Sequence, residues 1–137
     1  MPRGSEELTN ARKAEIVNAC AVLYETRSFK EITLKEIGEK TSFTRTSIYN
    51  YFQTKEEIFL ALFQREYEAW IEDLDALRCG HRNLSVDAFS DELAHTLERR
   101  ERLLKLMAMA NLLCVKRVGN QIQMDLWFRC WEWKKRT

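Results

Sequence analysis

Proline and glycine are scarce in this chain, at one and four residues of 137. Both residue types interrupt regular helices, and charged residues make up 31% of the sequence. This composition favours an all-helical protein. The length fits one ordinary domain or two small ones that share a core, and 45% hydrophobic residues are enough to build that core.

Long apolar runs and closely spaced cysteines are also missing. No run approaches the length needed to span a bilayer, and residues 1–13 lack the apolar segment of a signal peptide. The four cysteines are far apart and form no CxxC pair, which is typical of reduced thiols: Cys20, Cys79, Cys114 and Cys130. We therefore expect a cytoplasmic protein that has no contact with a membrane.

Residue sets that carry catalysis or bind metals are absent as well. The sequence has only two histidines, and it offers no Ser/His/Asp or Cys/His arrangement for nucleophilic catalysis. Cys79 and His81 have no further His or Cys close by, so they make a poor metal site. We therefore expect that the protein is not an enzyme and that it binds neither a metal nor a cofactor.

Charge is unevenly distributed, although the net charge is only +1. Residues 1–55 hold nine basic and seven acidic residues, residues 56–128 hold nine and thirteen, and residues 129–137 hold four and one. A mildly basic head on an acidic body suits a protein that touches nucleic acid with one end. The mixed run 98–102 (ERRER) indicates a solvated junction between two helices.

The segment from Thr33 to Phe52 predicts two short helices. Thr33 and Glu36 have the spacing of a capping box, in which each side chain binds a free backbone N–H at a helix start. We expect this helix to end near residues 41–42. Phe43 would then be a buried plug, and Thr44 would cap a second helix over residues 45–52.

The second predicted helix has two different sides. Ile48 and Phe52 are four residues apart and would face the core, while Arg45, Thr46, Tyr49 and Asn50 fall on the opposite side. An apolar back and a hydrogen-bonding front are typical of a helix-turn-helix unit. Two surface helices of an ordinary bundle would show the same spacing, so spacing alone leaves both readings open.

The surrounding sequence, ITLKEIGEKTSFTRTSIYNYFQTKEEIFLAL, resembles the DNA-binding domain of TetR-family transcriptional regulators. The resemblance covers about residues 10 to 75 and is most specific in SIYNYF and the following TKEE. The family usually has glycine where this chain has Ser42. A non-glycine residue held there at positive φ would cost about 1 kcal/mol.

The resemblance implies an all-α fold in which a three-helix head with a helix-turn-helix precedes a shortened helical bundle. Residues 1–53 would be the DNA-binding domain, and residues 54–137 the effector and dimerisation domain, incomplete relative to the family. Thr54 and Glu57 form a second capping box, which predicts a long connecting helix to about Leu77. The aromatic tail, with Trp127, Trp131 and Trp133, lies beyond the resemblance.

The resemblance also places the second short helix in the major groove of DNA. Arg45, Thr46 and Ser47 would then lie closest to base edges, and Asn50 would suit adenine. Phosphate contacts would come from the hydroxyl and ammonium groups of Thr33, Thr44, Tyr49, Tyr51 and Lys55. Lys35 would reach a base or a phosphate. A plain solvated lysine is the alternative for Lys55.

The implied function is a sequence-specific transcriptional regulator, namely a ligand-responsive repressor that binds double-stranded DNA at a palindromic operator as a homodimer. A small-molecule effector would occupy a pocket lined by Trp70, Met107, Met109 and Leu112, although such a stripe is more often plain core. The alternative function is a truncated helix-turn-helix relative that acts as a protein-interaction module without operator binding.

Overall fold

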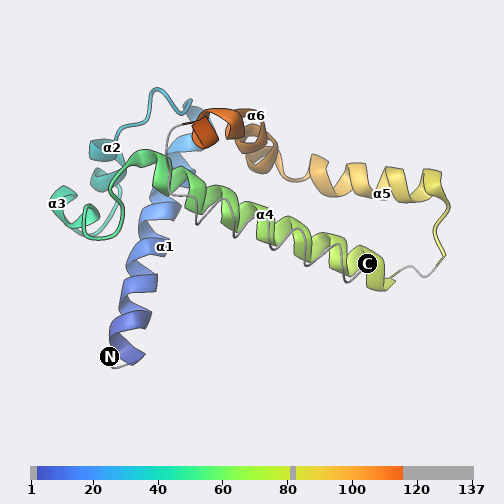
Figure 1. The fold of residues 1–137 in the computed structure, drawn as a ribbon, viewed down its shortest axis with the longest axis horizontal. Helices are drawn as coiled ribbons and strands as arrows, with labels where there is room; N and C mark the ends of the chain where they lie inside the picture. The colour runs from blue at the N-terminus through green and yellow to red at the C-terminus, as the bar shows by residue number, and fades with distance from the viewer. Residues whose placement is uncertain (1–2, 81–82, 116–137) are drawn as a thin grey trace. The chain divides into compact units, whose positions relative to one another are not determined.

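The computed structural model describes residues 3–80 and 83–115, which are helical apart from short connections (Figure 1). The helices are α1 (Arg3–Thr26), α2 (Leu34–Glu39), α3 (Arg45–Ile48), α4 (Lys55–Gly80), α5 (Val86–Glu98) and α6 (Glu101–Val115). The predicted all-α fold is confirmed. Within the described ranges, no helix is both long and apolar enough to cross a membrane.

The chain divides into two compact units, and the division falls inside α4. The first unit contains α1, α2, α3 and α4 as far as Leu62, and we call it the head; the second runs from Phe63 to Asn111. α4 is one continuous helix of 26 residues that contributes to both units. The expected functional boundary between residues 53 and 54 stays a prediction.

Several helix ends differ from the predicted ones. α1 begins at Arg3, and α4 continues to Gly80, beyond the expected Leu77. The predicted helix over residues 45–52 is wrong in its second half, because α3 ends at Ile48. The next residues form tighter turns, with the Tyr51 N–H donating to the Ile48 carbonyl at 2.8 Å.

One apolar stripe of α1 forms the centre of the head. The side chains on this stripe are all buried: Ile16, Ala19, Cys20, Leu23 and Tyr24. The Tyr24 ring meets the Phe59 ring of α4 edge-on at a centroid distance of 5.1 Å, and Phe29 meets the same ring at 4.9 Å. Edge-to-face aromatic contacts of this kind add to the stabilisation from apolar burial. They join α1, the segment after it and α4.

Polar and ionic contacts join the helices of the second unit. The Trp70 indole N–H donates to the Thr96 hydroxyl at 3.0 Å, and Thr96 is buried. Arg100 binds Asp73 at 2.6 Å, and Arg102 binds Glu66 at 3.0 Å. All of these bonds connect α4 to α5, to α6 or to the short link between α5 and α6.

The charged run 98–102 is therefore only partly what its composition indicates. It does mark a helix junction, because α5 ends at Glu98 and α6 begins at Glu101. A fully solvated run is the wrong reading, since Arg100 and Arg102 are half-buried against carboxylates of α4. Hydrogen bonds from the Arg100 guanidinium hold the pKa of Asp73 below its ordinary value.

Replacing Thr96 by valine should destabilise the second unit, because the half-buried Trp70 would lose the acceptor of its indole N–H at nearly unchanged side-chain volume. We expect the free energy of unfolding to fall by about 1–3 kcal/mol, measured by urea titration. Ser90→Ala is the control, since it removes an exposed hydroxyl of the same helix that binds only the Val86 carbonyl. Equal losses in the two variants would contradict the role of the Trp70–Thr96 bond.

Candidate nucleic-acid interface

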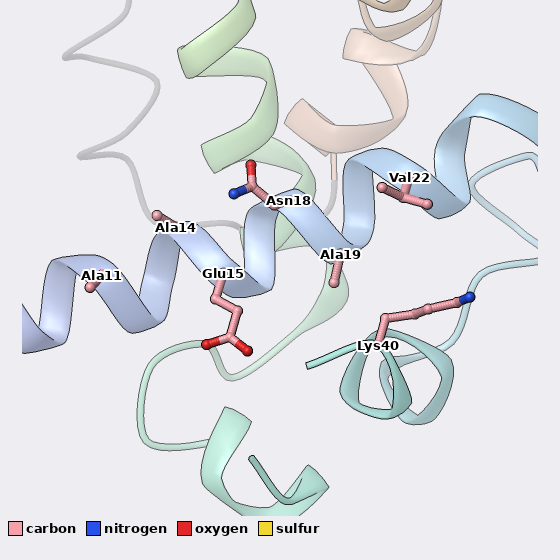
Figure 2. A pocket seen from close by; sticks show the side chains of 7 residues that line it. All are labelled: Ala11, Ala14, Glu15, Asn18, Ala19, Val22 and Lys40. Atoms are coloured by element: carbon pink, nitrogen blue, oxygen red, sulfur yellow. The ribbon is translucent and has the colours of Figure 1, made fainter. Parts of the chain in front are cut away.

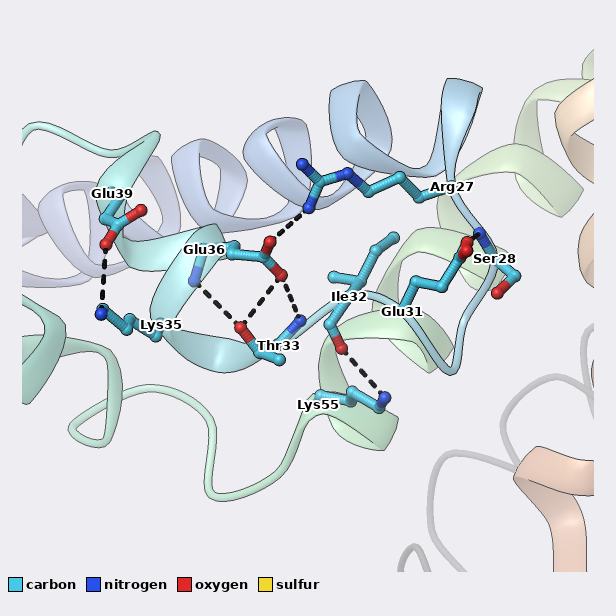
Figure 3. A network of polar contacts seen from close by, with 9 residues as sticks. All are labelled: Arg27, Ser28, Glu31, Ile32, Thr33, Lys35, Glu36, Glu39 and Lys55. Atoms are coloured by element: carbon cyan, nitrogen blue, oxygen red, sulfur yellow. Dashed lines mark hydrogen bonds and ion pairs between the residues drawn. The ribbon is translucent and has the colours of Figure 1, made fainter.

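The start of α2 is fixed by the predicted capping box, which the structure confirms. The Thr33 hydroxyl accepts from the Glu36 N–H at 3.3 Å, and the Glu36 carboxylate accepts from the Thr33 N–H at 3.0 Å (Figure 3). Arg27, just after α1, forms an ion pair with the same carboxylate. Hydrogen bonds from Arg27 and Thr33 lower the pKa of Glu36 from its ordinary value.

The turn between α2 and α3 is unstrained, although it lacks the glycine that is usual in the family. None of the described residues has a positive φ, so the strain expected at Ser42 is absent and that expectation is wrong. The Ser42 N–H donates instead to the Glu15 carboxylate of α1 at 2.5 Å. Figure 2 shows Glu15 projecting from α1 towards the segment between α2 and α3.

Arg12, one turn before Glu15 on α1, also contacts this turn. Its guanidinium carbon lies 5.0 Å from the centroid of the Phe43 ring, in a cation–π arrangement. Phe43 in turn meets Tyr51 edge-on at 6.1 Å. Phe43 is half-buried, so the fully buried plug predicted from the sequence is wrong. The Arg12 guanidinium covers one face of the Phe43 ring, and part of the Phe43 surface stays accessible to water.

Thr44 stands at the N-cap position of α3, as predicted, but its side chain makes no hydrogen bond to the backbone of that helix. Its hydroxyl lies 3.0 Å from the Ser47 hydroxyl. The cap expected from Thr44 is thus correct in position and wrong in mechanism. The Ser47 side chain, three residues further on, pairs with this hydroxyl, which would otherwise bind the backbone.

α3 and the residues after it separate into a buried side and an exposed side. Ile48 and Phe52 are buried, as predicted. Thr46, Tyr49 and Asn50 are exposed, and 41% of the Tyr49 surface is accessible. α3 and the turns after it therefore present side-chain hydroxyl and amide groups to solvent above a buried apolar side.

The remaining predicted contact residues have different surroundings. Lys35 is exposed and lies 4.0 Å from Glu39, and Tyr51 is half-buried beside Phe43. The side chains of Arg45 and Leu112 lie outside what the structure describes. Lys55 is half-buried, and its ammonium group binds two backbone carbonyls. The DNA contacts of these residues stay predictions.

Comparison with known proteins identifies the head. Residues 16–62 match the family model described as bacterial regulatory proteins of the tetR family. The resemblance to TetR-family regulators that was expected from the sequence is confirmed over these residues. The match begins at the first buried residue of the α1 stripe, Ile16, and ends where the head ends in α4, at Leu62. It therefore covers α2, the turn and α3, the elements on which the resemblance was based.

A relative from Bacillus subtilis (strain 168), the uncharacterized HTH-type transcriptional regulator YfiR, is 28% identical over 98 residues. The aligned region is 70% of this chain and 47% of the relative, so the chain spans about half of that protein's length. The likeness therefore extends beyond the segment that matches the family model, which is 47 residues long.

The expected ligand pocket receives less support from the described side chains. The Trp70 indole N–H donates to the Thr96 hydroxyl, Met109 is buried, and Met107 is 36% exposed. An open hollow of about 530 Å³ lies instead in the head, beside α1 and Lys40 (Figure 2). Small or polar side chains line it: Ala11, Ala14, Glu15, Asn18, Ala19, Val22 and Lys40. The pocket formed by Trp70, Met107, Met109 and Leu112 stays a prediction.

Arg12 and Glu15 are the site residues that the sequence did not reveal. Both lie off the apolar stripe of α1 and have the spacing of ordinary surface charges. Each contacts a residue about 30 positions further along the chain, and local spacing carries no information about such contacts. The one available signal was the missing glycine at Ser42, which implies that another group must hold the turn.

Glu15→Gln should loosen the turn that leads into α3. Hydrogen bonds from the side chain and backbone of Ser42, with a smaller effect of the Arg12 charge, lower the pKa of Glu15 below 4.5. A lowered pKa means that the carboxylate contributes stability above pH 4.5, and that this contribution is lost as the pH falls through the folded-state value. We expect Glu15→Gln to unfold at lower urea than the wild type at pH 7.

The difference between wild type and Glu15→Gln should then shrink below pH 4.5, which urea titrations over a pH series would measure. Glu7→Gln, an exposed carboxylate of the same helix, is the control. A stability difference that stays constant from pH 7 to pH 3 would contradict the role assigned to the charge of Glu15.

Proposed function

We propose that the chain is a sequence-specific transcriptional regulator whose TetR-family head binds the major groove of double-stranded DNA through α3. The observation that carries the proposal is the two-sided character of α3 and the turns that follow it, up to Phe52. Ile48 and Phe52 anchor this segment to the core, while Thr46, Tyr49 and Asn50 face solvent. Side chains at the start of a recognition helix reach base edges, and hydroxyl groups around it bind phosphates.

Within this proposal, Arg45 and Thr46 read base edges and Asn50 binds adenine if it reaches a base. Tyr49 and Thr44 hold phosphates, with Ser47 beside them. The half-buried Tyr51 contributes mainly through its hydroxyl end. Thr33 is less free, because its hydroxyl donates to the Glu36 carboxylate at 3.0 Å and would have to leave it to bind a phosphate.

Operator symmetry and dimerisation are part of the same proposal. One head offers the contacts of one half-site, and a homodimer presents two heads to a palindrome with half-site centres about 34 Å apart. Exposed apolar side chains in the second unit support self-association: 81% of the Val86 surface and 46% of the Phe89 surface are accessible. The aromatic tail with Trp127, Trp131 and Trp133 lies outside the described residues.

Repression controlled by a small-molecule effector rests on the family resemblance. A protein-interaction module without operator binding is the second candidate, and the exposed Val86 and Phe89 fit it equally well. Selecting random duplex DNA on the purified protein separates the two functions. A regulator should enrich a palindrome and bind it with strong salt dependence, whereas an interaction module should enrich no sequence.

Replacing Arg45 and Tyr49 by alanine should have different effects on the enriched operator. Arg45→Ala removes a base contact, so preference at one base pair of each half-site should relax at a cost of about 1–3 kcal/mol. Tyr49→Ala removes a backbone contact and should weaken binding to all sequences alike. Competition binding against operators that carry every single-base change would measure both effects.

Asp91→Ala is the control for these variants, because it alters an exposed residue of the second unit. Its base-preference profile and its affinity should match those of the wild type. A profile that Arg45→Ala leaves unchanged would remove Arg45 from base reading.

A further inference from the structure

The ammonium group of Lys55 is directed into the head. It donates to the Phe29 carbonyl at 2.6 Å and to the Ile32 carbonyl at 3.0 Å. It also lies 4.2 Å from the centroid of the Phe29 ring. Figure 3 shows the side chain running from the first residue of α4 to the segment before α2, where it meets Ile32. These three contacts come from residues 23 to 26 positions earlier in the chain.

The segment that Lys55 holds is the entrance to α2. Ile32 is fully buried, and the next residue, Thr33, begins the capping box with Glu36. The carbonyls of Phe29 and Ile32 lie outside the regular helices, and the Lys55 ammonium group supplies a charge-assisted donor for both. Lys55 therefore ties the beginning of α4 to the residue that precedes the first helix of the helix-turn-helix.

These contacts leave the ammonium group poorly placed for a phosphate. Two of its three N–H donors bind carbonyls, and the carbonyl dipoles together with the Phe29 ring already offset its charge. Lys30, in the same segment, differs in that its side chain is exposed. Lys30 and Lys55 thus carry the same charge in one neighbourhood but have different surroundings.

We infer that Lys55 is a positioning residue of the head, which sets the entrance to α2 and hence the placement of α3, and that it does not hold a DNA phosphate. This assignment replaces the phosphate contact that the family resemblance implies for Lys55. Its effect on DNA binding rests on the proposed function. Its effect on the geometry of the head does not.

The test compares Lys55→Met with Lys30→Met, using full-length protein. Each variant removes one positive charge, but only the first removes donors from the carbonyls of Phe29 and Ile32. Operator affinity is measured over a range of salt concentrations, and amide hydrogen exchange is measured at Thr33 and Glu36. Losing a phosphate contact lowers the slope of log affinity against log salt concentration by about 0.9, whereas losing a positioning contact leaves the slope unchanged.

We expect Lys55→Met to lower operator affinity about tenfold at an unchanged salt slope. Exchange at Thr33 and Glu36 should become faster, while the amides in the middle of α1 keep wild-type rates. Lys55→Arg should restore protection, because its donors reach both carbonyls and its guanidinium stacks on Phe29. Lys30→Met should change neither exchange nor affinity by more than about twofold. If Lys55→Met does not fold, Lys55→Gln, which keeps a neutral donor, takes its place.

A salt slope reduced by about 0.9 with unchanged exchange would overturn the inference and assign Lys55 to a phosphate. Faster exchange throughout the head would also overturn it, because this would indicate a general loss of stability without local positioning. If the wild type binds no selected DNA, the proposed function fails. The exchange measurement then still decides the role of Lys55.

Discussion

Helices of six and four residues have almost no stability of their own in water, because forming the first turn costs more than its hydrogen bonds return. α2 and α3 are of this kind, and the proposed DNA-binding surface is built on them. Their order therefore depends on burial: Ile37 and Ile48 are in the core of the head. The long helix α1 contributes the buried apolar stripe at the centre of the head.

Charged groups then fix the parts of the head that burial leaves loose. Glu36 closes the start of α2 and pairs with Arg27, Glu15 holds the turn through the Ser42 N–H, and Lys55 binds the carbonyls before α2. In each case a full charge meets a backbone group in an irregular segment, where regular secondary structure supplies no partner. These charges lie in the part of the sequence that looks mildly basic and free to meet DNA. Several of them are committed to the fold.

The second unit is held together by a different set of polar contacts. α4 is joined to the helices after it by one indole–hydroxyl bond, to the buried Thr96, and by two arginine–carboxylate pairs. Such contacts require specific partners, since leaving either member unpaired in a half-buried position is costly. They are therefore better at selecting one arrangement of the helices than at adding stability. Val86 and Phe89 remain exposed on α5, so these apolar side chains of the helix are not buried within the unit.

The sequence by itself determined the features whose partners are three or four residues apart. The capping box at Thr33 and the buried pair Ile48 and Phe52 follow from helical spacing, and the structure confirms them. Only the tertiary structure decided the roles of Glu15, Lys55 and Arg102, whose partners lie 27, 26 and 36 residues away. An exposed lysine such as Lys30 and a positioning lysine such as Lys55 cannot be told apart by the spacing and composition of the sequence around them. What separates them is which distant backbone carbonyl folding brings within hydrogen-bond distance.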